Sequence, residues 1–101
     1  SQGAIALLNN DDASVVDVRS ENDYEKGHIV NAINVTADKL KKGEGDLDAY
    51  KDKPLLLYCQ TGQIASSLIR PLKKQGFNEV HALRGGVAAW QNENLPLTKD
   101  T

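Results

Sequence analysis

Residues 55–67 read Leu-Leu-Leu-Tyr-Cys-Gln-Thr-Gly-Gln-Ile-Ala-Ser-Ser, and their pattern changes from that of a strand to that of a helix. Leu55 to Tyr58 form a short apolar run, which is typical of a strand buried on both faces. Residues 59–63 form a tight polar turn that contains Gly62, and apolar residues at helical spacing begin at Ile64. Cys59, the only cysteine of the chain, is therefore predicted to lie where a buried strand ends and a helix begins.

This position makes Cys59 a candidate reactive residue. The first turn of a helix leaves backbone N–H groups unpaired and carries partial positive charge, which stabilises an anion such as a thiolate. Gly62 allows the loop to curl so that successive amides point inward. The alternative is that Cys59 is only a small apolar side chain in the core.

Composition narrows the classes of function. The chain has 101 residues, which predicts one domain spanning residues 1–101. Its net charge is −2 and no basic stripe is present, so we expect no nucleic-acid partner. No apolar run is long enough to span a membrane, and a single cysteine excludes an internal disulfide. With two distant histidines, a metal site is not expected. We expect a cytoplasmic monomer, while a membrane anchor preceding Ser1 stays an open alternative.

Predicted strands alternate with predicted helices along the chain. The strands are 14–18, 32–35, 54–58 and 79–83, and the helices or helical turns are 4–8, 21–26, 37–42, 46–50, 63–75 and 87–92, with an extended tail at 94–97. We expect Ser20 and Gly27 to bound the second helix and Pro71 to kink the fifth. The alternation predicts an α/β fold, a four-stranded parallel sheet with helices on both faces. The carboxyl ends of its strands should bring Arg19, Cys59 and residues 84–86 to one rim.

Four ordered motifs covering nearly the whole chain support a family assignment. They are Val16-Asp17-Val18-Arg19, then Gly27-His28-Ile29 with Ala32-Ile33-Asn34-Val35, then Leu57-Tyr58-Cys59-Gln60-Thr61-Gly62, and finally Leu83-Arg84-Gly85-Gly86 with Trp90. Together they resemble the rhodanese family of sulfurtransferases. The resemblance implies a five-stranded parallel sheet, whose opening strand would precede Ser1, so four strands are expected here.

The resemblance also implies a function. Cys59 would take a sulfane sulfur from a donor as a persulfide and pass it to a thiol or another nucleophile, a covalent two-step scheme. The persulfide-binding loop would consist of Gln60, Thr61, Gly62, Gln63, Ile64 and Ala65, whose amides would stabilise the negative sulfur. The partners are then a sulfane-sulfur donor and a thiol acceptor, each a small molecule or a protein, and no cofactor is needed.

The remaining site residues are assigned by charge and position. Ile64 and Gln60 stand where related loops often carry basic or hydroxyl side chains, so we expect weak activity with thiosulfate. Arg84 and Arg19 are candidate anion contacts. Asp17 is expected to pair with Arg19 and to serve the fold, because buried charges need partners. His28 is expected to have a structural role near the site.

Three rival functions differ in class. A phosphatase needs a longer cysteine loop that ends in arginine, whereas Ala65 stands six residues after Cys59. A non-catalytic interaction module would keep the fold without the chemistry; Cys59 and Gly62 argue against it, and Ile64 mildly for it. A thiol redox sensor would use the same activated cysteine without sulfur transfer.

Overall fold

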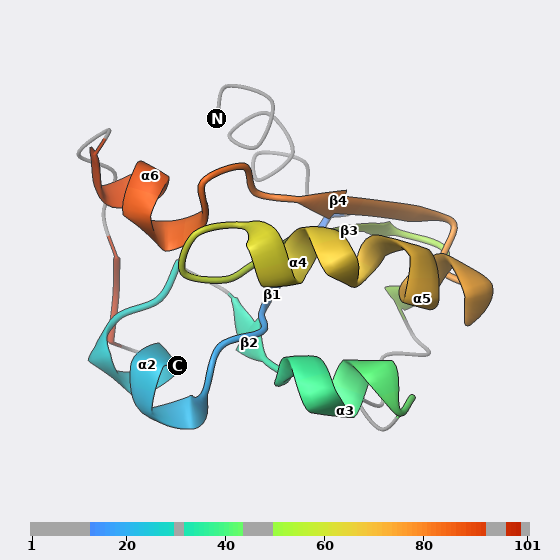
Figure 1. Cartoon of the computed structure of the whole chain (residues 1–101), viewed down its shortest axis with the longest axis horizontal. Helices are drawn as coiled ribbons and strands as arrows, with labels where there is room; N and C mark the ends of the chain where they lie inside the picture. Colours follow the sequence, from blue (N-terminus) through green and yellow to red (C-terminus); the bar gives the residue numbers. More distant parts are fainter. Residues whose placement is uncertain (1–12, 30–31, 44–49, 93–96, 100–101) are drawn as a thin grey trace.

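The computed structural model describes residues 13–29, 32–43, 50–92 and 97–99. Its sheet has four strands in the order β2-β1-β3-β4, and every neighbouring pair is parallel (Figure 1). The strands are β1 (Ser14–Asp17), β2 (Ile33–Asn34), β3 (Pro54–Tyr58) and β4 (Glu79–Ala82). The predicted fold class, an α/β fold with a four-stranded parallel sheet, is confirmed.

Strand β3 lies between β1 and β4 and is the most deeply buried strand. Residues 55–58 are at most 1% exposed, as expected for an apolar run covered on both faces. Leu57 is in register with Val16 of β1 and with Ala82 of β4. Because all four strands run in the same direction, the segments that follow them meet at one edge of the sheet.

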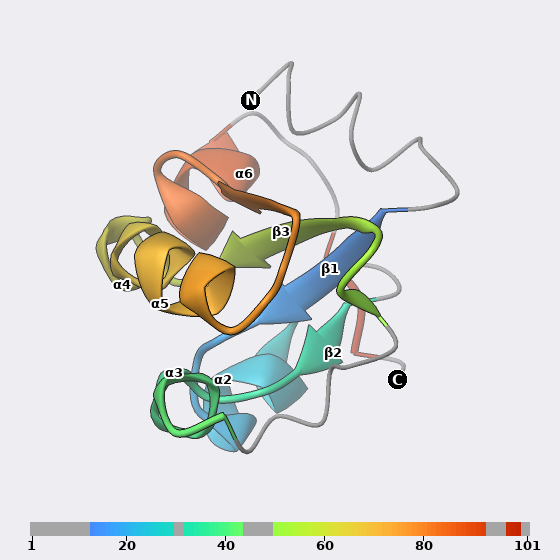
Figure 2. The same ribbon diagram turned by 90° about the vertical axis from the view of Figure 1, so that its right-hand side faces the viewer.

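Helices cover both faces of this sheet. The helices are α2 (Glu21–Lys26), α3 (Ala37–Lys41), α4 (Gln63–Ser67), α5 (Ile69–Lys74) and α6 (Gly86–Asn92). Helices α3, α4 and α5 lie on the same side (Figure 2) and share a core with Leu55 and Leu57. Helices α2 and α6 pack on the other face through Tyr24 and Trp90, against Leu56 and other residues of the second core. Alternate residues of β3 therefore face the two helical layers.

Local signals set the ends of α2. The Oγ of Ser20 accepts a hydrogen bond from the backbone N–H of Asp23 at 3.3 Å, which caps the first turn. Gly27 ends the helix with φ at 154°, and its N–H donates to the carbonyl of Tyr24. Both ends agree with the sequence-based prediction.

We call residues 59–65 the cysteine loop. The helical segment that begins within this loop differs from the prediction of one kinked helix over 63–75. It forms two helices, α4 and α5, separated at Leu68. Pro71 has no N–H to donate to the carbonyl of Ser67, so the regular hydrogen-bond pattern fails one turn before the proline. The N–H of Leu68 donates instead to the carbonyl of Ala65, three residues earlier, which tightens the end of α4.

Some predicted elements lie outside the described residues. These are the helix at 4–8, residues 46–49 of the helical turn at 46–50 and residues 94–96 of the tail at 94–97. In the described part of the chain, no helix is both long and apolar enough to cross a membrane.

Candidate active site

Cys59 directly follows β3, and its sulfur lies against the first turn of α4. The backbone N–H of Gly62 donates to Sγ at 3.0 Å, and that of Ala65 donates at 3.4 Å. The residue is only 3% exposed. Two backbone amide donors therefore converge on one sulfur atom at the point where β3 ends and α4 begins.

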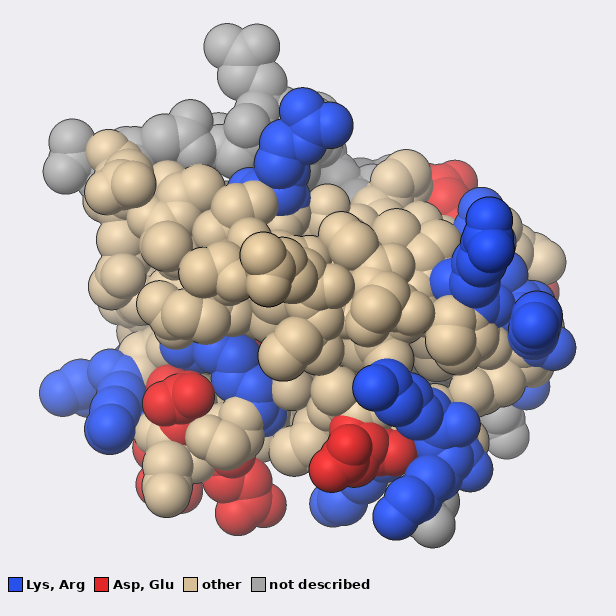
Figure 3. All heavy atoms as spheres, in the orientation of Figure 1, with Lys and Arg blue, Asp and Glu red and all other residues tan. Residues whose placement is uncertain are grey.

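Most side chains of the loop are exposed to solvent. Gln60, Thr61, Gln63 and Ile64 are exposed, whereas Ala65 is fully buried. Residues 59–67 include no charged side chain. Figure 3 shows the same character at a larger scale, because the surface over α4 is mostly uncharged and lysine and arginine atoms gather over the C-terminal ends of α3 and α5. The loop thus presents amides to the sulfur and uncharged side chains to solvent.

The N-terminus of α6 holds the start of this loop in place. The N–H of Val87 donates to the carbonyl of Cys59 at 2.9 Å, and the N–H of Ala88 donates to the carbonyl of Gln60 at 3.0 Å. Gly86 has φ at +60°, and a Cβ at this position would come within 2.7 Å of the carbonyl carbon and oxygen of Gln60. A glycine is therefore required for the approach of the two backbones.

Gly62 makes a second close contact between the same segments. Its φ is +97°, and a Cβ there would lie 3.0 Å from the backbone nitrogen of Gly85 and 3.2 Å from the carbonyl oxygen of Leu83. The sequence predicts that residues 84–86 lie on the rim, but it does not indicate that Gly86 and α6 position the cysteine loop. The available signal was the glycine pair Gly85-Gly86 at the short turn that follows β4.

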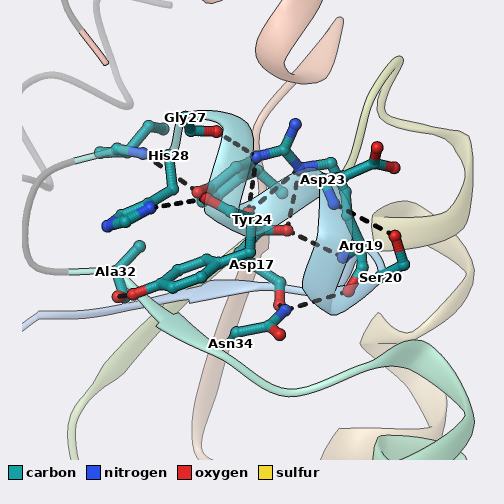
Figure 4. Close-up of polar contacts among 11 residues, drawn as sticks. Asp17, Arg19, Ser20, Asp23, Tyr24, Gly27, His28, Ala32 and Asn34 are labelled. Atoms are coloured by element: carbon teal, nitrogen blue, oxygen red, sulfur yellow. Dashed lines mark hydrogen bonds and ion pairs between the residues drawn. The ribbon is translucent and has the colours of Figure 1, made fainter. Parts of the chain in front are cut away.

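Asp17 and Arg19 form a buried pair beside this rim (Figure 4). Arg19 Nε lies 3.1 Å from both carboxylate oxygens, and Nη2 donates to Oδ2 at 2.8 Å and to the carbonyl of Gly27 at 2.6 Å. The backbone N–H of Arg19 adds a bond of 2.8 Å to Oδ1. The side chain of Asn34 donates to the carbonyls of both residues at 3.0 Å. The pair therefore ties the ends of β1, β2 and α2 together.

The charge of Asp17 also acts on its neighbours. Burial alone would lower the pKa of Arg19, but the hydrogen bonds and the charge of Asp17 outweigh burial and raise it. Burial and the charge of Asp17 raise the pKa of Tyr58 well above its usual value and raise that of Tyr24 less. The guanidinium lies 5.6 Å from the ring centre of Tyr58, so the tyrosine is a neutral platform for the cation.

His28 lies beside Tyr24, within the same network of polar contacts (Figure 4). It is 1% exposed, and its ring stacks on Tyr24 with centres 3.7 Å apart. Nδ1 lies 2.9 Å from the carbonyl oxygen of Tyr24. The backbone of His28 exchanges hydrogen bonds with Thr98 in both directions. These contacts connect the end of α2 to residues 97–99.

The structure separates the two arginines that the sequence placed on the rim. Arg19 lines an open pocket of about 170 Å³ whose wall also includes Gln60 of the cysteine loop. Arg84 is exposed in the turn between β4 and α6, and within the described residues it makes no hydrogen bond or ion pair. The described residues also hold no group of three His, Cys, Asp or Glu side chains that could bind a metal ion.

Comparisons with known proteins identify the family. The family model described as "Rhodanese-like domain" matches residues 2–93. "Uncharacterized protein YibN" of Escherichia coli K12 is 40% identical over 97 residues, which are 95% of this chain and 68% of that protein. "Thiosulfate sulfurtransferase GlpE" of Coxiella burnetii is 38% identical over 85 residues, 84% of this chain and 78% of that protein. The crystal structure of a rhodanese-related protein from Thermoplasma volcanium superposes with a TM-score of 0.81 at 26% identity, covering 96% of this chain and 94% of that one. The chain therefore belongs to the rhodanese family, which includes sulfurtransferases.

Proposed function

We propose that the protein is a sulfurtransferase or sulfur carrier that holds a sulfane sulfur on Cys59 as a persulfide. The observation that carries this proposal is the convergence of the Gly62 and Ala65 amides on Sγ at the end of a buried strand. A structural cysteine in the core needs no such donors, whereas a nucleophilic thiolate and the charged persulfide formed from it do.

The reaction has two steps that balance without a cofactor. In the first step, the Cys59 thiolate attacks the outer sulfur of a donor R–S–S⁻. A new S–S bond forms on Cys59, the donor S–S bond breaks, and R–S⁻ leaves with the electron pair and takes up a proton. In the second step, an acceptor thiolate attacks the outer sulfur of the persulfide, and the Cys59 thiolate is the leaving group.

The loop argues for a donor of low charge. Thiosulfate carries two negative charges, and no cation stands among residues 59–67 to offset their repulsion with the thiolate. The two amides already point at one sulfur, and Ile64, which is 52% exposed, offers neither charge nor a hydrogen bond. Thiosulfate should therefore be a poor donor compared with a less charged persulfide.

Mass spectrometry of the intact protein tests the proposal. After incubation with a sulfane-sulfur donor and removal of the excess, the protein should gain the mass of one sulfur atom, and a reducing thiol should remove it. Cys59→Ser should not gain this mass while its circular dichroism spectrum and melting temperature stay close to those of the wild type. Ser66→Ala, a change to an exposed residue of α4, is the control and should load normally.

The result also separates the rival functions. If the wild-type protein gains no sulfur from any persulfide donor, the proposal is contradicted and a non-catalytic interaction module becomes the favoured function. A protein that gains only oxygen atoms after peroxide treatment would be a redox sensor. A Cys59→Ser variant that still transfers sulfur would show that the wrong residue has been assigned.

A further inference from the structure

The pocket beside the cysteine loop has charges of both signs on its wall. It has a volume of about 170 Å³ and lies between α2, the cysteine loop and α6. Its lining residues are Arg19, Asp23, Lys26, Gly27, Gln60, Val87, Gln91 and Leu97. Figure 3 shows acidic and basic atoms near one another at the α2 end of this face, in contrast to the uncharged surface over α4.

The pocket borders the reactive residue through two of its lining residues. Gln60 follows Cys59 in the chain, and the N–H of Val87 donates to the Cys59 carbonyl at 2.9 Å. A small molecule bound in this pocket therefore lies against the start of the loop that holds the sulfur. This volume is well above the roughly 10–15 Å³ that a single water molecule requires, so the pocket has room for a small organic molecule.

The charge available to a ligand comes from α2. The guanidinium of Arg19 is engaged by the carboxylate of Asp17 and the carbonyl of Gly27, so the buried pair is neutral as a unit. Asp23 and Lys26 are three residues apart on α2 and therefore share a face. Within the described residues, neither side chain forms an ion pair. The pocket thus offers one free carboxylate and one free ammonium, together with two side-chain amides.

We propose that this pocket binds the zwitterionic end of a small amino-acid thiol, of the chemical class of cysteine, as the sulfur acceptor. Asp23 receives the ammonium group of the acceptor and Lys26 its carboxylate, with the amides of Gln60 and Gln91 beside them. A dianion is a poor fit, because Asp23 repels it. The inference rests on the proposed function and specifies its second step, in which the acceptor thiolate takes the outer sulfur and the Cys59 thiolate leaves.

Four thiols test the assignment of each charge. Cysteine has both groups, cysteamine only the ammonium, 3-mercaptopropionate only the carboxylate, and 2-mercaptoethanol neither. The wild type and each variant are first loaded with sulfur and checked by intact mass, and kcat/KM for unloading is then measured with each thiol. The intrinsic reactivity of a thiol cancels when variant and wild type are compared with the same acceptor.

Each variant should affect only the thiols that carry the matching group. Lys26→Gln should lower kcat/KM about two- to fivefold for cysteine and 3-mercaptopropionate and leave cysteamine and 2-mercaptoethanol unchanged. Asp23→Asn should lower it by a similar factor for cysteine and cysteamine only. This range corresponds to the strength of partly exposed ion pairs, and the effects should shrink at high salt.

Matched controls come from α3. Asp38 and Lys41 occupy the first and last turns of that helix, as Asp23 and Lys26 occupy those of α2, and neither lines the pocket. Asp38→Asn and Lys41→Gln should change none of the four rates. The inference is overturned if the α2 variants slow all four thiols equally, or none of them, while sulfur loading is normal. Failure of loading in the wild type would instead overturn the proposed function.

Discussion

Replacing Gly86 with alanine tests whether α6 positions the cysteine loop. A Cβ on Gly86 would overlap the Cys59 carbonyl oxygen and would lie 2.7 Å from the carbonyl carbon and oxygen of Gln60. These are backbone atoms, so the loop or the start of α6 must move. The left-handed conformation costs an alanine about 1–2 kcal/mol. Loss of the bonds from the Val87 and Ala88 N–H groups adds about 0.5–1.5 kcal/mol each.

The expected total is about 2–5 kcal/mol, which a domain with the usual 5–15 kcal/mol of stability survives at low temperature. The rate of sulfur loading should fall more than stability alone explains, by about 100-fold if the sulfur moves by about 1 Å. Stopped-flow loading with a persulfide donor and urea unfolding at the same temperature measure the two effects separately. A folded Gly86→Ala variant that loads sulfur at the wild-type rate would refute the reasoning.

Gly76→Ala is the matched control for this experiment. Gly76 also has a positive φ, at +108°, but a Cβ there would meet only the flexible side chain of Lys51, at 3.6 Å or more. The variant should lose about 1–2 kcal/mol of stability and retain the wild-type rate of sulfur loading. The comparison between the two alanines isolates the contact with the loop from the cost of the backbone conformation.

Three further changes address the buried pair, the tyrosine and the loop surface. Asp17→Ala leaves the Arg19 guanidinium buried without its counter-charge and should lower the free energy of unfolding by about 3–5 kcal/mol in urea titrations; loss of activity at unchanged stability would give Asp17 a catalytic role instead. Because the pKa of Tyr58 is raised, the folded state keeps the phenolic proton at a pH of about 10 and above, whereas the unfolded state loses it. The free energy of unfolding should therefore fall as the pH rises through this range, and it should fall less steeply in Tyr58→Phe. Equal slopes of melting temperature against pH in the two proteins would contradict this. Ile64→Arg should raise kcat/KM for thiosulfate severalfold, more at low salt than at high salt, whereas Ile64→Gln should not; an unchanged thiosulfate rate in a folded Ile64→Arg variant would show that charge at this position does not limit the reaction.

The features that could be predicted from the sequence depend on local patterns. The buried strand, the turn at Gly62 and the helix start follow from residues that are neighbours in the chain, and β3 and α4 form where they were predicted. The ion pair of Asp17 with Arg19 could also be inferred, because a carboxylate in a buried strand needs a partner two residues away or across the sheet.

Other features depend on distances that the sequence does not contain. Both arginines follow strands, but only Arg19 turns inward, because Asp17 and the Gly27 carbonyl accept its hydrogen bonds. Gly86 could be recognised from the sequence as a turn residue. Its contact with the cysteine loop could not, because this contact depends on how the start of α6 packs against the backbone of Cys59 and Gln60. The break at Leu68 was missed because the effect of Pro71 falls a full turn earlier in the chain.

The backbone and the side chains of the cysteine loop are expected to have different roles. The backbone would serve the chemistry, and the exposed side chains would serve the choice of substrate. The sulfur is held by backbone N–H groups, and the backbone is held by α6, so no side chain of residues 60–64 needs to contact the sulfur. Those side chains are exposed and can change without moving the amides. Substitutions at Gln60 or Ile64 should therefore alter which donors and acceptors react, whereas substitutions at Gly62 or Gly86 should alter whether the reaction occurs. For the same reason, an uncharged loop is expected to limit the donors and acceptors of the proposed reaction without arguing against a reactive cysteine.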